Sequence, residues 1–311
     1  MGIELRHLAA LRAVIEEGSF NRAALRLGYT QSAVSQQIGA LERIVGHRLL
    51  NRQIGSNKIS LTPPGERFLA HADRLLDGLL TAEADLADLR RGGGERLAVG
   101  TYQSVGVRVL SHVLGRFSTT WPGVAVQLVE SWSDDELLDQ LRRGELTLTV
   151  ATAPVIGRAF EWVELMTDPI VLVVQADSPL AGKTAVRPRD LAELPVIGYS
   201  QCKTTAIVSE FFRRDGISPR FVHIADENGL IQALVRSGVG AALMPRLAVD
   251  QRDEEIRMVD LAPPQVARTM LLVWHRDRGR SLAATSFVEM TQRACARVAA
   301  RLFEDAQPLA R

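Results

Sequence analysis

Cysteine is scarce in this 311-residue sequence, and its scarcity excludes several classes of protein. The two cysteines, Cys202 and Cys295, lie far apart and outside any Cys/His spacing typical of metal ligands. A disulfide-stabilised fold and a structural zinc site are therefore not expected. The six histidines are also scattered without ligand spacing, so we predict no metal site.

Long apolar runs are absent as well. No segment approaches the length that is needed to cross a bilayer. The N-terminal stretch MGIELRHLAALRAVIEEG mixes acidic with apolar residues and lacks the cleavage site of a secretory signal peptide. We therefore expect a cytoplasmic protein that does not associate with membranes.

Motifs typical of enzymes are missing too. The sequence contains no Walker motif, no GxSxG elbow and no HExxH helix. Gly238-Val-Gly240 looks like part of a dinucleotide fingerprint, but it is predicted to follow a helix and enter a strand, the reverse of the order that binds pyrophosphate. Catalysis is not expected, and no cofactor is predicted.

Charge is distributed unevenly along the chain. Residues 1–60 contain eight Arg and Lys against four acids, a net charge of +4, so the remainder carries −3 to give the overall +1. A positive field at the N-terminus is suited to meeting phosphate groups. The length, with 46% hydrophobic and 23% charged residues, suits a globular protein of one small domain plus a larger one, or of two domains of middling size.

Capping residues divide the first 46 residues into three helices. Gly18, Gly28 and Gly46 each follow a segment with helical spacing of apolar residues and are predicted to end it. Ser19 and Thr30 are predicted to cap the second and third helices. Two short helices joined at a glycine turn are typical of a helix-turn-helix.

The third predicted helix, residues 31–45, has an apolar stripe that includes Val34, Ile38 and Leu41. Its opposite face is small and polar, and consists of Ser32, Ser35, Gln36, Gly39 and Arg43. Glutamine and arginine can pair with base edges in the major groove. Residues 52–61 contain a Gly-Ser-Asn turn and predict a β-wing whose cations lie along the DNA.

The stretch SFNRAALRLGYTQSAVSQQIGALERIVGHRLLNR, followed by LTPPGERFL, resembles the DNA-binding domain of LysR-type transcriptional regulators over residues 3–70. The resemblance implies that residues of the third helix approach bases or phosphates and that Arg52 serves the wing. The predicted DNA-binding residues are Ser19, Thr30, Gln31, Ser32, Ser35, Gln36, Arg43, Arg52 and Lys58.

A heptad seam follows in the helix predicted for residues 63–91. Its apolar positions are Phe68, Ala72, Leu75, Leu79, Ala82, Leu86 and Leu89. Such a seam requires a partner helix, and the alternative is packing on the chain's own C-terminal domain. The family resemblance implies a homodimer, a homotetramer through further contacts, and a double-stranded DNA operator with dyad symmetry; it leaves contact with RNA polymerase open.

From Arg96 onward, strands alternate with helices in two similar sets, which predicts a mainly parallel, doubly wound α/β domain. SGVGAALMP extends the LysR resemblance, which implies an effector domain similar to periplasmic binding proteins, with two α/β subdomains. The predicted divisions are a winged helix-turn-helix at 1–62, a linker helix at 63–91, a hinge at 92–94, subdomain one at 95–167 and 270–311, and subdomain two at 168–269.

Ligands of open α/β sheets bind beyond the carboxyl ends of the strands. Polar residues at these positions form the predicted effector site, namely Thr101, Gln103, Ser104, Ser131, Trp132, Thr152, Ser200, Cys202, Lys203, Thr204, Glu227 and Asn228. Several precede predicted helices, whose N-termini favour anions. We therefore expect a small organic effector, carboxylate-bearing rather than cationic.

The function predicted from these features is that of a transcription factor that responds to a small molecule. Two alternatives remain open at this point. A constitutive repressor would bind DNA without any ligand. A redox sensor would use Cys202, but would need a second cysteine placed to pair with it.

Overall fold

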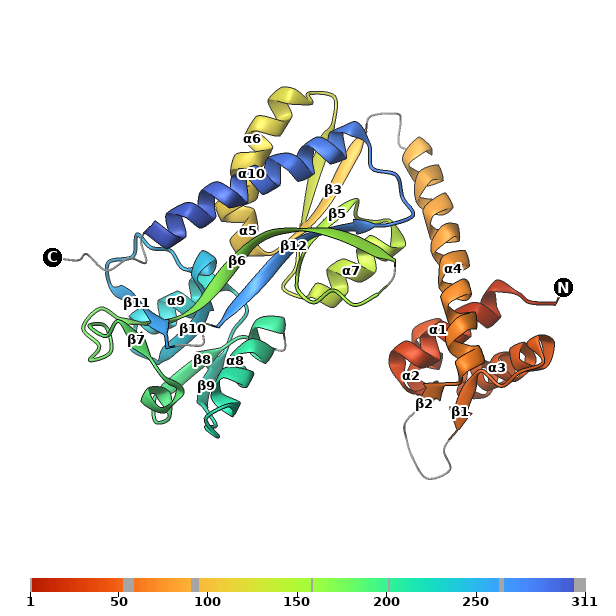
Figure 1. Ribbon diagram of the computed structural model, residues 1–311, viewed down its shortest axis with the longest axis horizontal. Coiled ribbons are helices and arrows are strands. Elements are labelled where there is room, and N and C mark those ends of the chain that lie inside the picture. The colour runs from red at the N-terminus through yellow and green to blue at the C-terminus, as the bar shows by residue number, and fades with distance from the viewer. Residues whose placement is uncertain are drawn as a thin grey trace. The chain divides into compact units, whose positions relative to one another are not determined.

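The computed structural model describes residues 2–52, 59–90, 95–157, 159–200, 202–262 and 266–304 (Figure 1). The chain divides into two units, residues 1–87 and 88–311. Two predicted features, the hinge at 92–94 and Lys58, lie outside the described residues. The domain boundaries within the chain remain predictions.

The N-terminal unit begins with the three predicted helices. They are followed by a two-stranded antiparallel sheet and a long helix, in the order α1 (Leu5–Glu17), α2 (Phe20–Leu27), α3 (Gln31–Val45), β1 (Leu50–Arg52), β2 (Ile59–Leu61) and α4 (Pro63–Arg90). Gly18, Gly28 and Gly46 end the first three helices with φ of 59°, 68° and 71°, a conformation in which glycine has no Cβ to clash. The hydroxyls of Ser19 and Thr30 accept hydrogen bonds from the first turns of α2 and α3. The local signals for the helix-turn-helix are confirmed.

The wing is attached to α3 by one carboxylate. Oε1 of Glu42 accepts hydrogen bonds from the backbone N–H groups of Leu49 (2.8 Å) and Leu50 (3.2 Å), where β1 begins. A Cβ on Gly65 of α4 would lie 2.1 Å from the carbonyl oxygen of the same Leu49, so only glycine fits there. Glu42 thus ties the start of β1 to α3, and Gly65 allows α4 to approach the same segment.

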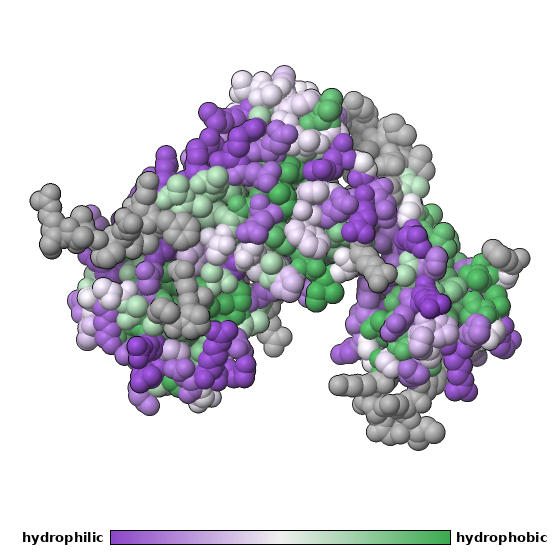
Figure 2. All heavy atoms as spheres, viewed as in Figure 1, coloured by the Kyte–Doolittle hydropathy of each residue, from purple (hydrophilic) through white to green (hydrophobic). Residues whose placement is uncertain are grey.

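The predicted seam of α4 divides into two parts. Ala72 is buried, and it packs with Leu76 and Leu8 against the chain's own first helix. Leu75 and Leu79 are 60% and 40% exposed, and green apolar residues are visible along α4 in Figure 2. The start of the helix therefore belongs to the core of the N-terminal unit, whereas Leu75 and Leu79 lie at its surface. The side chains of Leu86 and Leu89 lie outside the described residues.

The C-terminal unit is built on a ten-stranded mixed sheet, in which β4, β3, β5, β12, β6, β10, β8 and β9 are neighbours in that order. β11 pairs with β6 and β7. The strands are β3 (Arg96–Thr101), β4 (Ala125–Glu130), β5 (Leu148–Thr152), β6 (Phe160–Gln175), β7 (Ala185–Val186), β8 (Pro195–Gly198), β9 (Arg220–Ile224), β10 (Ala241–Pro245), β11 (Ile256–Leu261) and β12 (Ala267–His275).

Helices and helical turns connect these strands. They are α5 (Gln103–Val105), η1 (Gly106–Leu110), α6 (Ser111–Thr120), α7 (Asp134–Arg143), η2 (Pro188–Leu191), α8 (Lys203–Arg213), α9 (Asn228–Arg236), η3 (Arg246–Ala248) and α10 (Leu282–Glu304). In Figure 1, α6 and α10 lie side by side on one face of the first half of the sheet, and α7 lies on the other. The second half carries α8 and α9 on its two faces, in separate apolar clusters.

The long strand β6 joins the two halves. Its first part pairs with β12, and from Ile170 onward it pairs with β10 and β11. The β4-β3-β5 and β10-β8-β9 groups are parallel, as expected, but β6 and β12 run antiparallel to their neighbours. The apolar run after Pro169 predicted only the second part of β6, because the charged residues Glu161 and Glu164 interrupt the pattern of the first part.

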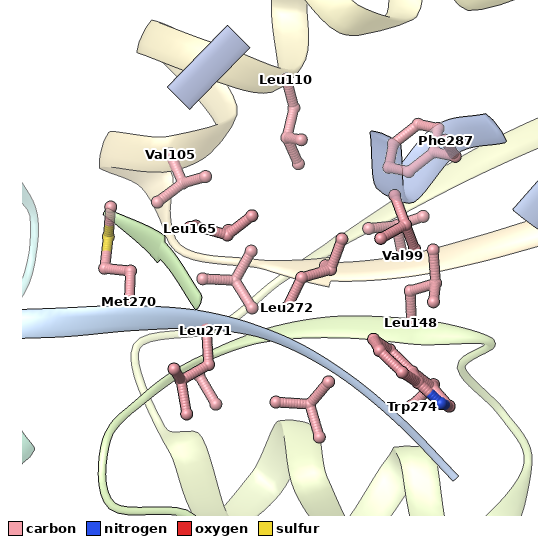
Figure 3. Close-up of a cluster of buried hydrophobic side chains, with 14 of the residues drawn as sticks. Val99, Val105, Leu110, Leu148, Leu165, Met270, Leu271, Leu272, Trp274 and Phe287 are labelled. Carbon is pink, nitrogen blue, oxygen red and sulfur yellow. The ribbon is translucent and has the colours of Figure 1, made fainter. Parts of the chain in front are cut away.

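A single apolar cluster fills the first half of the C-terminal unit. Leu148, Leu272 and Phe287 in this cluster are completely buried, and Figure 3 shows them between the sheet and the helix above it. The prediction of two similar α/β halves is confirmed by this core and by the two clusters of the second half.

Hydrophilic residues cover much of the face in Figure 2, and apolar residues reach the surface in patches. Among the described residues, none of the helices combines the length and apolar character that a membrane span requires. The same part of the chain contains no group of three or more His, Cys, Asp or Glu side chains that could hold a metal ion.

Candidate functional site

The outward face of α3 carries the polar residues that the sequence singled out for DNA binding. Gln31, Ser32 and Gln36 are exposed, and Ser35 is half-buried. Val34, Ile38 and Leu41 on the inner face are fully buried, so the helix cannot rotate without losing its core contacts. The packing thus leaves the glutamine and serine side chains free to meet a DNA groove.

Of the remaining predicted DNA-binding residues, Ser19, Thr30, Arg43 and Arg52 lie in the described part of the chain. Ser19 and Gln31 line one shallow hollow together with Arg22. Thr30 is exposed beside Ser32, with 3.0 Å between their hydroxyl oxygens, and Arg43 is exposed in the last turn of α3. Arg52 is the last residue of β1. Glu42 was not predicted from the sequence, because a lone glutamate on a helix gives no sign of its contact with the wing.

A cavity of about 250 Å³ lies between the two halves of the C-terminal unit. It is open to the surface at the carboxyl ends of the strands, as expected for a ligand site in this kind of sheet. Its lining consists of Tyr102, Gln103, Ser104, Glu130, Ser131, Trp132, Asp134, Thr152, Tyr199, Cys202, Lys203, Thr204, Asp226, Glu227, Asn228, Pro245, Ala248 and Arg268.

Ten of the twelve residues proposed from the sequence lie in this lining, and Thr101 and Ser200 do not. Thr101 is 1% exposed, and its hydroxyl donates a hydrogen bond to the carbonyl oxygen of Tyr102. Ser200 is bound to the loop beyond it, since Oδ1 of Asp226 accepts hydrogen bonds from its N–H (3.0 Å) and its hydroxyl (2.6 Å). Proximity to a strand end therefore does not by itself direct a side chain into the cavity.

One polar bridge across the cavity is formed by Gln103. Its Nε2 donates to Oε1 of Glu227 at 2.7 Å, and its Oε1 accepts from Nδ2 of Asn228 at 2.6 Å. The hydroxyl of Tyr199 donates to Oδ1 of Asn228 at 2.8 Å. The hydrogen bond from Gln103 lowers the pKa of Glu227, which remains a carboxylate, whereas burial raises the pKa of Tyr199, which remains a protonated donor.

A second bridge is formed by Lys203, at the first position of α8. Its Nζ lies 2.8 Å from Oδ2 of Asp134 and 2.9 Å from the carbonyl oxygen of Pro154, and it also donates to the carbonyl oxygen of Thr152. Burial raises the pKa of Asp134, and the neighbouring Lys203 opposes that rise. The lysine is 30% exposed at its side chain, so it is enclosed by these oxygens rather than extended into solvent.

The inner wall of the cavity contains a buried ion pair. Arg268 donates from Nη2 to Oδ2 of Asp168 at 2.8 Å and to the hydroxyl of Ser104 at 3.0 Å. Its guanidinium carbon lies 5.6 Å from the centre of the Tyr102 ring. This pair was not predicted from the sequence, although a charged residue inside each of two apolar strands is a signal for buried partners.

The charges that line the cavity are mostly negative. Four lining residues are acidic, Glu130, Asp134, Asp226 and Glu227, and two are basic, Lys203 and Arg268. Both basic groups are engaged in the ion pairs described above. The hydroxyl of Thr204, by contrast, makes no hydrogen bond with another described residue, and no side chain caps the N-terminus of α8 beside it.

The two cysteines occupy different environments. Cys202 lies in the cavity lining, and Cys295 is fully buried in the apolar core of the first half. Burial raises the pKa of Cys295 to about 12, so its thiol is not disposed to ionise. A redox mechanism that pairs these two thiols is not favoured by this arrangement.

Comparison with known proteins agrees with this combination of sites. Residues 5–66 match the model of the bacterial regulatory helix-turn-helix proteins of the lysR family, and residues 90–296 match that of the LysR substrate binding domain. The chain belongs to the LysR family of transcriptional regulators. An uncharacterized HTH-type transcriptional regulator of Escherichia coli, YnfL, is 31% identical over 92% of this chain and 97% of its own length. The Hca operon transcriptional activator HcaR of the same species is 28% identical over 96% of this chain and all of its own.

Solved structures of full-length LysR-type proteins share the fold. A Corynebacterium glutamicum OxyR C206 mutant matches this regulator with a TM-score of 0.61 at 23% identity, over 99% of this chain and 96% of that one. Full-length CbnR complexed with its target DNA matches with a TM-score of 0.55 at 24% identity, over 94% and 100% of the two chains.

Proposed function

We propose that this LysR-family regulator binds a double-stranded operator with dyad symmetry, and that a small organic effector in the cavity between its subdomains changes that binding. The observation that carries the proposal is the composition of the cavity lining, to which strand-end loops of both subdomains contribute polar side chains. A ligand that contacts both subdomains necessarily favours some angles between them over others. Unequal affinity for two conformations is what a sensor requires.

A carboxylate end of the effector fits one part of the cavity. The hydroxyls of Thr204 and Ser104 and the N–H groups at the start of α8 are hydrogen-bond donors at this wall. A helix N-terminus without a capping side chain favours a negatively charged group. The effector is therefore proposed to carry a carboxylate, held by Thr204 and its neighbours.

Pairing of two protomers through α4 would give the protein the two-fold symmetry that matches an operator with dyad symmetry. Leu75 and Leu79 leave an apolar strip uncovered on this helix, and a second copy of the same helix has the matching surface. A homodimer formed in this way carries two recognition helices for two half-sites. Assembly to a homotetramer is proposed from the family alone.

Regulation of transcription, rather than catalysis, is the proposed activity, and operator binding would place the protein in the cytoplasm with the DNA. The constitutive repressor is the competing proposal, and a ligand that alters operator binding would reject it.

A metabolite screen by thermal shift, followed by calorimetry and operator-binding measurements on the full-length protein, tests this function. We expect a ligand that raises the melting temperature and also changes operator affinity or DNA bending. Thr204→Val should lower the affinity for that ligand by about 2- to 10-fold, which corresponds to the loss of one hydrogen bond. Thr101→Val is the matched control, because its hydroxyl points away from the cavity. Equal ligand affinity in both variants would place the effector elsewhere.

A further inference from the structure

The ammonium group of Lys203 has a complete set of partners. A lysine ammonium has three N–H donors, and three oxygens accept from this one, Oδ2 of Asp134 and the carbonyls of Thr152 and Pro154. All three acceptors come from the first half of the C-terminal unit, whereas Lys203 begins α8 in the second half. The first half of the C-terminal unit thus binds an ammonium group that the second half supplies.

The acceptor set is held in place independently of Lys203. Asp134 is 8% exposed at the start of α7, and its Oδ2 also accepts a hydrogen bond from the N–H of Thr152 at 3.2 Å. Thr152 lies at the end of β5, which is fully buried along its length. Removal of Lys203 would therefore leave a buried carboxylate in position but without a cation, which is an unfavourable state.

Two further features of this wall favour a cation. Glu130 is exposed at the cavity edge, and its carboxylate makes no hydrogen bond or ion pair with another described residue. Trp132 lines the same edge with 53% of its surface exposed, and the face of an indole attracts ammonium groups. Since acidic groups already outnumber basic ones in the lining, a ligand with a positive charge reduces the excess and a simple anion increases it.

We propose that the Asp134 carboxylate and the carbonyl oxygens of Thr152 and Pro154 form an ammonium-binding subsite, which Lys203 fills until an effector with a primary amine displaces it. The inference rests on the proposed role of the cavity as the effector site and adds the chemical class of the ligand. A ligand that places its amine at Asp134 and its carboxylate at the start of α8 is a molecule of the amino acid type. Displacement of Lys203 removes a contact between the subdomains, and this couples binding to their relative movement.

Such a ligand must make a second contact in the cavity. The ammonium of Lys203 is tethered, and a short tether corresponds to an effective concentration on the order of millimolar. A simple amine therefore competes poorly in the wild-type protein. It should bind readily once the lysine side chain has been removed, and this difference allows a direct test.

The test is chemical rescue of Lys203→Ala by n-propylammonium chloride, whose carbons and nitrogen replace the side-chain atoms beyond Cβ. We expect n-propylammonium to raise the melting temperature of full-length Lys203→Ala in a saturable way and several-fold more than that of wild type, whereas equal concentrations of sodium chloride or n-propanol do not. Lys183→Ala is the matched control, since it removes an ion pair with Asp190 in the same half of the unit. The double variant Lys203→Ala with Asp134→Asn should lose the rescue.

An equal response to n-propylammonium in wild type, Lys183→Ala and Lys203→Ala would overturn the proposal, and so would rescue that persists with Asp134→Asn. If the alanine variant does not fold, Lys203→Met keeps the side chain out to the Cε position, and ammonium chloride then serves as the probe with the same two outcomes.

The failure of this inference is distinguishable from failure of the proposed function. One informative result would be an acid without an amine that regulates operator binding and binds wild type and Lys203→Ala equally well. That result would support the effector site and reject the ammonium subsite. Conversely, n-propylammonium could rescue Lys203→Ala while no cavity ligand affects operator binding. That result would support the ammonium subsite and reject the sensor function.

Discussion

The double substitution Leu75→Glu with Leu79→Glu should separate the two protomers without unfolding either one. Both side chains lie on the uncovered side of α4, at 60% and 40% exposure, and neither belongs to a described apolar cluster. Glutamate is also a good helix former, so α4 itself should persist. The effect should therefore appear in association and not in the stability of the N-terminal unit.

The size of the effect follows from the exposed fractions. Burial of a whole leucine side chain contributes about 1.5–3 kcal/mol. The two exposed fractions together equal about one whole leucine per protomer, so two protomers lose about 3–6 kcal/mol, which corresponds to about 10²- to 10⁴-fold weaker dimerisation. Repulsion between the four introduced carboxylates adds to this loss.

Light scattering and sedimentation over a range of concentrations measure the association, and operator titration measures its consequence. Leu25→Glu is the control, because Leu25 is 82% exposed on α2 and lies outside the seam. The control should remain a dimer in scattering experiments. If the double variant has the same mass and operator affinity as wild type, α4 does not pair the protomers, and the reasoning from its exposed leucines is refuted.

Three further substitutions test individual contacts. Gln36→Ala should cost about 1–3 kcal/mol at one base position of each half-site, and an equal loss on operator and random DNA would contradict base recognition. Glu42→Ala should destabilise the N-terminal unit by about 1–3 kcal/mol, because the N–H of Leu49 loses its acceptor, and should weaken binding to all DNA sequences alike in the same titration. Arg268→Met should cost about 3–5 kcal/mol in urea unfolding, because Asp168 stays buried without a cation; a change below about 1 kcal/mol would contradict this.

Most of the DNA-binding unit could be predicted because its signals are local. The second and third helices each begin after a capping hydroxyl, Ser19 or Thr30, and each end at a glycine, Gly28 or Gly46. The seam of α4 was also visible as a repeat. The sequence did not show that the seam divides into a buried and an exposed part. Ala72 is buried because it packs against Leu8 of α1, and the two helices meet only in the folded unit.

The cavity also shows which features the sequence predicts and which it does not. The order of strands and helices was sufficient to identify the loops at which ten lining residues occur, since parallel strands carry their loops to one edge of the sheet. Sequence order does not specify which way a side chain points, and Thr101 faces the carbonyl of its neighbour instead of the cavity.

The sequence by itself determined the family, the two-unit organisation and the recognition helix, because these depend on short-range patterns that survive in any context. The tertiary structure alone decided the partners of the charged groups. Arg268 meets Asp168 because β6 and β12 run antiparallel to each other, and Lys203 meets Asp134 because the two halves of the sheet face one cavity. Contacts between residues 69 and 100 positions apart depend on the folded path of the chain, and only the packed strands place such distant charges within hydrogen-bonding distance.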